Sequence, residues 1–204
     1  MPKPTLRSDA VRNRDLVLEA AEKVFGDEGT EASTEVIARR AGVGTGTVFR
    51  HFPTKEKLLE AVLERMVLRL DTAARRCLDD SFPGDPGAAL FSALHHLVEG
   101  TAAKKAVVDA LASTGVDVRT YPSINRLWET VGELLSRAQR AGAARKDVGI
   151  RELIAVVIGA ARAAQSARHD RALRERVIGV VLDGLRSAEK LHSKNRTTVK
   201  SVTS

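Results

Sequence analysis

Four basic side chains lie close together in one short stretch of this sequence, with no acidic residue among them. The basic residues of the stretch 36–55 are Arg39, Arg40, Arg50 and Lys55. Because the stretch contains no Asp or Glu, it carries a formal charge of +4. Guanidinium and ammonium groups form charge-assisted hydrogen bonds with phosphate oxygens, so these residue types favour contact with a polyanion.

The elements that must position these side chains are two short helices joined by a tight turn. Ser33 is placed to cap the first helix, whose expected buried face is Val36, Ile37 and Ala41. Gly42 supplies the turn, and we expect it to adopt a positive φ, which a Cβ atom disfavours. Two helices joined in this way form a helix-turn-helix, whose second helix can enter a DNA major groove.

The second of these helices is expected to present polar side chains outward. Val43 and Val48 are expected to hold the two helices together from the inside, and Pro53 ends the second helix. The side chains expected to face outward are Thr45, Thr47, Arg50 and His51.

The charge of the whole chain supports a polyanionic partner only in part. The formal net charge is +7, which suits nucleic acid but also keeps many soluble proteins in solution. Residues 1–55 contain nine Lys or Arg and eight Asp or Glu, so their net charge is only +1. A DNA-binding face therefore requires segregation of charge, with Glu19, Glu22, Asp27 and Glu31 facing elsewhere.

Helical periodicity dominates the remainder of the chain. Apolar residues recur at helical spacing from about residue 14 to 26, and again from Lys55, behind a Thr54 cap, to about Cys77. Further helices are predicted at 88–101, 104–112, 123–141, 151–168 and 172–188, with a break at 82–87 and a turn at 113–122. Good helix formers prevail and no segment has the period of a strand, so the predicted fold class is all-α.

The motif in the first third of the chain resembles that of a known family. Its residues are Ile37-Ala38-x-x-Ala41-Gly42-Val43, then Gly46-Thr47-Val48-Phe49-x-His51-Phe52-x-x-Lys55. This pattern resembles the DNA-binding domain of the tetracycline-repressor (TetR) family of bacterial regulators. The resemblance covers about residues 12–62. Beyond residue 62 the chain resembles the family only in having an all-helical second half of the right length, apart from a weaker sequence likeness at 142–148.

The resemblance implies a homodimer that binds a palindromic operator in double-stranded DNA, represses transcription and is released by a small-molecule effector. It implies phosphate contacts for Ser33, His51 and Lys55. The residues implied to meet base edges or nearby phosphates are Thr45, Thr47 and Arg50.

Two positions of the recognition helix depart from the family pattern. Gly44 stands where Ser or Thr is usual, so its cap is expected to be weaker or to come from Thr45. Phe49 stands where Tyr is usual, so this DNA-facing residue lacks a phenolic hydroxyl for phosphate.

The sequence pattern and the family resemblance together predict that the chain has three segments. Residues 1–54 are predicted to form a three-helix, helix-turn-helix DNA-binding domain, of which 1–12 is a flexible arm. Residues 55–190 are predicted to form a helical domain for effector binding and dimerisation, entered through the long helix that begins at Lys55. Residues 191–204 are polar, lack acidic groups and are expected to be disordered.

The candidates for an effector site are scattered over the second domain. They are Phe91, His95, Trp128 and Arg162, for each of which ordinary packing or solvent exposure is the alternative. His95 and His96 do not predict a metal site, because adjacent helical residues point about 100° apart and no partner with a suitable spacing is evident.

Small residues in the last two helices indicate close helix packing. Residues 159–167 are mostly small, and Gly179 and Gly184 lie in the following helix. The pattern is compatible with tight packing within the chain or with a four-helix bundle formed by two chains. The candidate dimer-interface residues are Ile158, Ala161, Gly179 and Leu182.

Other classes of protein are less well supported. A nonspecific DNA-coating protein remains the alternative to an operator-binding regulator. An enzyme is disfavoured, because no nucleophile–base pair, carboxylate pair or phosphate loop is evident, and no cofactor is expected. The single cysteine, Cys77, excludes an intramolecular disulfide. The longest apolar run, 153–161, is too short to span a bilayer, and no signal peptide is evident, so we expect a cytoplasmic protein without membrane contact.

Overall fold

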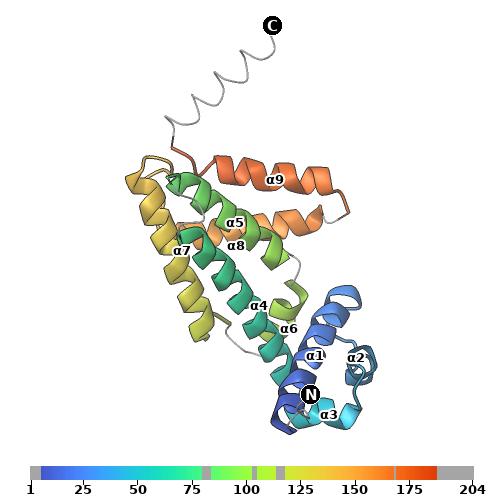
Figure 1. Cartoon of the computed structure of the whole chain (residues 1–204). Coiled ribbons are helices and arrows are strands. Elements are labelled where there is room, and N and C mark those ends of the chain that lie inside the picture. The colour runs from blue at the N-terminus through green and yellow to red at the C-terminus, as the bar shows by residue number, and fades with distance from the viewer. Residues whose placement is uncertain (1–5, 80–83, 103–104, 114–117, 168, 188–204) are drawn as a thin grey trace, which may run out of the picture. The chain divides into compact units, whose positions relative to one another are not determined.

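Helices form the regular structure of this chain. The computed structural model describes residues 6–79, 84–102, 105–113, 118–167 and 169–187. Within these ranges the elements are nine α-helices and one short 3₁₀ helix, which confirms the predicted all-α class (Figure 1). In chain order they are α1 (Leu6–Asp27), α2 (Thr34–Ala41), α3 (Thr45–His51), α4 (Lys55–Leu78), α5 (Pro86–Ala102), α6 (Lys105–Ser113), η1 (Val118–Thr120), α7 (Pro122–Arg140), α8 (Ile150–Ser166) and α9 (Arg171–Asp183).

The chain divides into two compact units, and α4 contributes to both. The first unit comprises residues 1–67 and 104–121, and the second comprises 68–103 and 122–204. The sequence placed the boundary between residues 54 and 55 and assigned α6 to the second domain, so both assignments differ from the structure. The first half of α4 groups with the first unit: Leu58, Leu59, Val62 and Leu63 are buried, and Arg65 donates to the Asp15 carbonyl of α1 at 3.2 Å.

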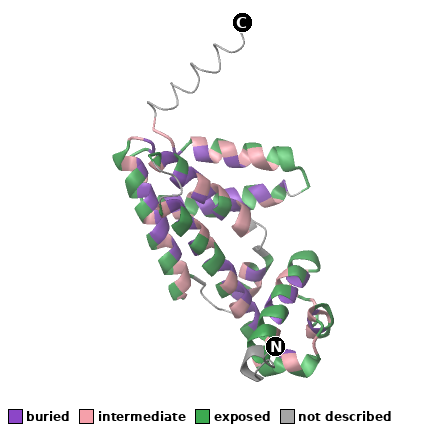
Figure 2. Cartoon of the chain, viewed as in Figure 1, coloured by how far each residue is buried: buried purple, intermediate pink, exposed green. Residues whose placement is uncertain are grey.

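The core of the first unit is built from side chains that recur every three or four residues. Buried residues alternate with exposed ones along α1 (Figure 2). Val17, Ala21 and Val24 of this helix are wholly buried. They meet Ile37 of α2 and Val48 of α3, which are also 0% exposed. Helices α2 and α3 both pack against α1, and α6 packs against it as well.

The core of the second unit is organised around α5. This helix packs against α7, α8 and α9. It can do so because its buried side chains extend beyond one stripe: Leu90, Leu94 and Leu97 lie along one side, and the buried Ala89, Phe91 and Val98 widen that surface. A helix with a single apolar stripe would cover only one neighbour.

One polar cluster lies inside the second unit. Asp71 of α4 and Thr130 of α7 are 5% and 4% exposed. The Thr130 hydroxyl donates to Asp71 Oδ1 at 2.8 Å, and Arg75 Nε donates to the other carboxylate oxygen at 3.0 Å. The buried carboxylate is therefore satisfied by two donors, as burial of a charge requires.

The prediction of a flexible arm over residues 1–12 is wrong for residues 6–12. These residues form the first turns of α1, which begins at Leu6. Extending an existing helix adds one hydrogen bond for each residue fixed, so a well-anchored helix grows into an adjacent polar segment. Residues 1–5 lie outside the described residues.

The last helix ends earlier than the predicted residue 188. Helix α9 stops at Asp183, and the chain then runs beside the loop that joins α7 to α8. Arg145 N–H donates to Leu185 C=O at 3.1 Å, and Ser187 N–H donates to Ala143 C=O at 3.2 Å. These bonds form an isolated bridge, which we call the loop clamp (residues 142–147 with 184–187). The predicted disordered tail, 191–204, lies outside the described residues.

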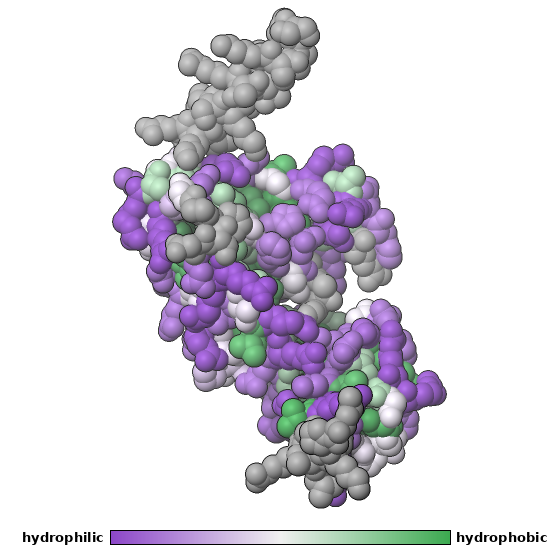
Figure 3. Space-filling model, viewed as in Figure 1, coloured by the Kyte–Doolittle hydropathy of each residue, from purple (hydrophilic) through white to green (hydrophobic). Residues whose placement is uncertain are grey.

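Polar residues cover most of the visible surface of the protein (Figure 3). Among the helices in the described ranges, none is long and apolar enough to cross a membrane.

Candidate DNA-binding site

Helix α2 is fixed at its start by the predicted cap. The Ser33 hydroxyl accepts a hydrogen bond from the Val36 N–H at 3.4 Å, with Ser33 itself in an extended conformation. A hydrogen bond from the same hydroxyl, together with the Glu35 backbone, lowers the pKa of the Glu35 carboxyl. Ser33 is exposed, but a phosphate that approached its hydroxyl would have to displace this carboxylate.

The turn after α2 has the predicted glycine geometry. Gly42 has φ 69° and ψ 28°, which lies in the left-handed region. Its N–H donates to Arg39 C=O at 3.2 Å, and the Val43 N–H donates to Ala38 C=O at 3.0 Å. This pattern of bonds satisfies the last carbonyls of α2 and turns the chain sharply into α3.

Helix α3 is anchored by one side chain and leaves the others accessible. Val48 is completely buried, so the opposite side of this seven-residue helix faces away from the core. Gly44 occupies the N-cap position without a side-chain hydrogen bond. Thr45 is the first helical residue, so of the two expected alternatives the cap supplied by Thr45 is wrong and the weaker cap at Gly44 is confirmed.

The residues predicted to contact DNA lie on or next to this accessible side. Thr45, Phe49 and Arg50 are exposed, whereas Thr47, His51 and Lys55 are half-buried. Phe49 is 47% exposed, so its aromatic ring is accessible to a partner. Arg50 forms no hydrogen bond or ion pair with any other described residue, so its guanidinium is available.

The four basic residues of the stretch 36–55 are not equally available. Arg40 Nη2 lies 3.2 Å from Asp27 Oδ2 of α1, so part of its charge is already neutralised. Arg39 is exposed at the end of α2. The basic surface is therefore concentrated on Arg39, Arg50 and Lys55.

One basic residue near α3 could not be found from the sequence. The guanidinium of Arg14, on α1, lies 5.4 Å from the centre of the Phe52 ring, which immediately follows α3. The two residues are far apart in sequence, so only the packing of α1 beside α3 brings them together. Arg14 adds a cation next to the end of the recognition helix.

The four candidate effector residues have different environments. Phe91 is 6% exposed beneath the guanidinium of Arg186 at 4.0 Å, and His95 lies one turn later on α5. Trp128 on α7 is half-buried and Arg162 on α8 is exposed. Within the described part of the chain, no hydrogen bond, ion pair or ring contact joins these four residues to one another.

The four candidate dimer-interface residues fall into two groups, accessible and buried. Ile158 is 43% exposed, and a Cβ added at Gly179 would meet nothing within 4 Å. Ala161 and Leu182 are 3% and 7% exposed, so their side chains pack within the chain. Val180, which the sequence did not single out, is 74% exposed on α9.

Two family models match this chain. A model described as bacterial regulatory proteins of the tetR family matches residues 17–62. A model described as the C-terminal domain of SbtR-like transcriptional regulators matches residues 85–187. The two matches together cover helices of both compact units.

Individual proteins show the same similarity. An HTH-type transcriptional regulator of Staphylococcus aureus (strain bovine RF122 / ET3-1) is 38% identical over 76 residues, which are 37% of this chain and 41% of that protein. The match thus spans less than half of that relative. The crystal structure of a TetR transcription regulatory protein from Mycobacterium vanbaalenii is 41% identical, with a TM-score of 0.69, and the match covers 89% of this chain and 99% of the other. A TetR transcriptional regulator from Streptomyces coelicolor is 35% identical over 86% of this chain and 99% of its own, with a TM-score of 0.69.

Proposed function

Because the chain belongs to the tetR family of bacterial regulatory proteins, we propose that it regulates transcription by binding a palindromic DNA operator as a homodimer. In this proposal the protein represses its target until a small-molecule effector releases it. The observation that carries the proposal is the accessible side of α3, which combines hydroxyl, aromatic and basic side chains opposite the buried Val48.

Each side chain of this surface has a role that its chemistry allows. Arg50 can donate two parallel hydrogen bonds to a guanine edge, and Thr45 and Thr47 can bond to base edges or phosphates. His51 and Lys55 are assigned to phosphates, which fix the position of the helix without reading sequence. Phe49 offers an apolar face to a thymine methyl group.

The proposed dimer uses the outer faces of α8 and α9. Ile158 and Val180 are large exposed apolar residues there, and Gly179 leaves space for a close approach. Ala161 and Leu182 would support this face from beneath. A two-fold dimer can present its recognition helices about 34–36 Å apart, which matches successive major grooves on one side of the DNA.

The proposed effector response acts through α4. This helix contributes residues to both units, so a change at its second half on effector binding can be passed to the first unit along one continuous helix. The expected result is a changed separation of the two recognition helices. Equal separations in effector-bound and DNA-bound crystals would contradict this mechanism.

Operator binding can be tested with two variants of the basic surface. An operator is first selected from random DNA, and affinity is then measured by fluorescence anisotropy at several salt concentrations. Arg50→Ala should weaken binding by about 1–3 kcal/mol and relax base preference at one position in each half-site. Lys55→Ala should weaken binding to every sequence and lower the salt slope by about one unit.

A control and a contrary outcome make this test decisive. Arg140→Ala removes an exposed arginine from α7 in the second unit and should leave operator affinity unchanged. Equal affinity of the unmodified protein for operator and scrambled DNA, with a steep salt slope, would favour a nonspecific DNA-coating protein instead.

The dimer is tested separately by adding charge to its apolar face. Ile158→Glu and Val180→Glu should convert the dimer to monomers in analytical ultracentrifugation while the helical content is retained. Val11→Glu provides a matched control, because Val11 is 63% exposed on α1 and lies outside the proposed face. Dimers that persist in both α8 and α9 variants would place the interface elsewhere.

A further inference from the structure

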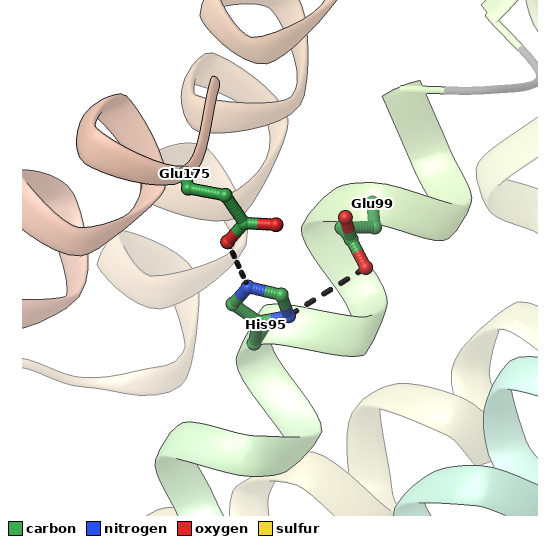
Figure 4. A group of neighbouring side chains, drawn as sticks. All are labelled: His95, Glu99 and Glu175. Atoms are coloured by element: carbon green, nitrogen blue, oxygen red, sulfur yellow. Dashed lines mark hydrogen bonds and ion pairs between the residues drawn. The ribbon is translucent and has the colours of Figure 1, made fainter. Parts of the chain in front are cut away.

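Three side chains of types that bind metal ions meet where α5 packs against α9 (Figure 4). His95 and Glu99 lie one turn apart on α5, and Glu175 reaches them from α9. Each residue offers one possible ligand atom, and the three atoms all lie within 4.8 Å of one another. We propose that these three residues bind a divalent transition-metal ion, most favourably Zn²⁺.

The two carboxylates contact opposite nitrogens of the His95 ring, so binding of one ion requires the side chains to rearrange around one of these nitrogens. His95 Nε2 lies 3.0 Å from Glu175 Oε2, and His95 Nδ1 lies 3.7 Å from Glu99 Oε2. With metal–ligand bonds of about 2.0–2.2 Å, neighbouring ligands of one tetrahedral ion are about 3.3–3.6 Å apart. The 3.0 Å separation of His95 and Glu175 is that of a hydrogen bond, so the Glu175 carboxylate must move slightly aside for an ion on Nε2. Glu99 now faces Nδ1, so its side chain must rotate toward the same ion to become the third ligand.

The charge of the cluster suits a divalent cation. Two carboxylates and one neutral imidazole supply a charge of −2, which one Zn²⁺ neutralises. An imidazole nitrogen with carboxylate oxygens is a donor set that Zn²⁺ accepts readily.

Partial exposure allows the ion to enter and to complete its coordination with water. The side chains of His95, Glu99 and Glu175 are 34%, 37% and 41% exposed. Three protein ligands with an open position filled by water are a common zinc arrangement. A bound ion would join α5 to α9 more strongly than the hydrogen bond between His95 and Glu175.

Two arginines of α9 compete with a metal ion for the same carboxylates. Arg174 Nη2 lies 3.8 Å from Glu99 Oε1, and Arg171 and Arg174 both act electrostatically on Glu175. In the absence of metal these contacts form an ordinary ion-pair cluster. Metal affinity should therefore rise when Arg174 loses its charge, whereas a purely ionic cluster gives no such response.

The test is zinc titration of the untagged full-length protein by isothermal calorimetry, with Co²⁺ absorption as a second probe. The unmodified protein should bind one ion per chain. His95→Asn and Glu175→Gln should each weaken binding by about tenfold or more. Arg174→Gln should bind zinc more tightly. Because metal ligands must be deprotonated, binding should also weaken in acid.

The neighbouring histidine supplies a matched control. His96 is exposed, and its Nδ1 is 2.7 Å from the Ser92 carbonyl oxygen, so it is turned to a different partner. His96→Asn should bind zinc as the unmodified protein does, and zinc should raise the melting temperature of both but not of His95→Asn. Absence of one-to-one binding, or unchanged affinity in His95→Asn, would overturn the proposal. Neither measurement involves DNA, so the result is independent of the proposed regulatory function.

Discussion

The two compact units are held together in different ways. In the first unit the functional helices α2 and α3 have only 8 and 7 residues. Isolated helices shorter than about 12–15 residues are marginal in water, so these two depend on caps, on the turn and on a few buried anchors. In the second unit, longer helices share an extensive core around α5. The short helices thus leave most of their side chains accessible for recognition, whereas the second unit uses its side chains for burial.

The largest predicted effects come from removing one anchor in each unit. Ile37→Ala and Leu94→Ala each delete a side chain that is 0% exposed. Each should lower the free energy of unfolding by about 2–5 kcal/mol. If the two units differ as described, hydrogen exchange in Ile37→Ala should accelerate throughout α2 and α3, whereas Leu94→Ala should affect α5, α7, α8 and α9.

An exposed leucine of α4 provides the control for these two variants. The Leu68 side chain is 56% exposed, so Leu68→Ala should change the free energy of unfolding by no more than about 0.5 kcal/mol. Uniform acceleration of exchange across both units in Ile37→Ala would show that the first unit does not depend on local anchors.

The next effect concerns the buried polar cluster of the second unit. Thr130→Val keeps the shape of the side chain but removes the hydroxyl that donates to Asp71 at 2.8 Å. The buried carboxylate then loses one of its two donors and keeps Arg75, which should lower the free energy of unfolding by about 1–3 kcal/mol in urea unfolding. Ser136→Ala is the matched control, because this exposed hydroxyl of α7 bonds only to the Gly132 carbonyl. Equal effects of the two variants would rule out a special contribution from burial.

Two glycines should respond to alanine with opposite signs. Gly42 has φ 69°, so Gly42→Ala should cost about 1–2 kcal/mol. Gly159 lies within α8, and a Cβ there meets nothing within 4 Å, so Gly159→Ala should add about 0.5–1 kcal/mol. Both are best measured by urea unfolding in the Ile158→Glu background, where a partner chain is not expected. Destabilisation by both substitutions would contradict the open space beside Gly159.

The smallest effect depends on pH and lies in the loop clamp. The Arg145 guanidinium bonds to Asp147 and holds the pKa of that carboxyl at about 2. Because the folded-state pKa is below the unfolded value of about 3.9, the stabilisation is complete above that value and is lost as the pH falls through about 2. The urea midpoint of the native protein should exceed that of Asp147→Asn near neutrality, and the difference should vanish in this acidic window. Glu129→Gln, at an exposed carboxylate of α7 that pairs with no described residue, should show no such convergence.

Short-range sequence signals made the helix-turn-helix of the first unit predictable. Ser33, Gly42 and Thr54 each act within three or four residues, and each has the predicted role. Helical periodicity likewise located α4, which ends one residue beyond the expected Cys77. The exposure of α3 follows from the same pattern, since only Val48 is directed into the core. The DNA contacts themselves stay predictions.

Features that depend on distant partners could not be predicted in this way. The end of α9 depends on pairing with a loop about 40 residues earlier, and Arg14 meets Phe52 only through packing. Glu175 is 80 residues from His95, so no spacing rule connects them. Glu99, however, lies four residues after His95 on the same helical face. This possible partner of His95 could therefore have been predicted from the sequence spacing.

The loop clamp determines the order in which the last helix can open. Four hydrogen bonds hold the segment after the C-terminus of α9. Two are the backbone bonds of the loop clamp, between Arg145 and Leu185 and between Ser187 and Ala143. In the other two, the Ser187 hydroxyl donates to the Gly142 carbonyl oxygen at 2.6 Å and Arg145 Nη1 donates to the Gly184 carbonyl oxygen at 3.3 Å. The opposite end has the Asp170 cap, through one bond of 2.9 Å, together with the part-exposed side-chain contacts of Arg174 and Glu175 with α5. Helix α9 should therefore fray from its first turn, and Glu175 lies close to that first turn.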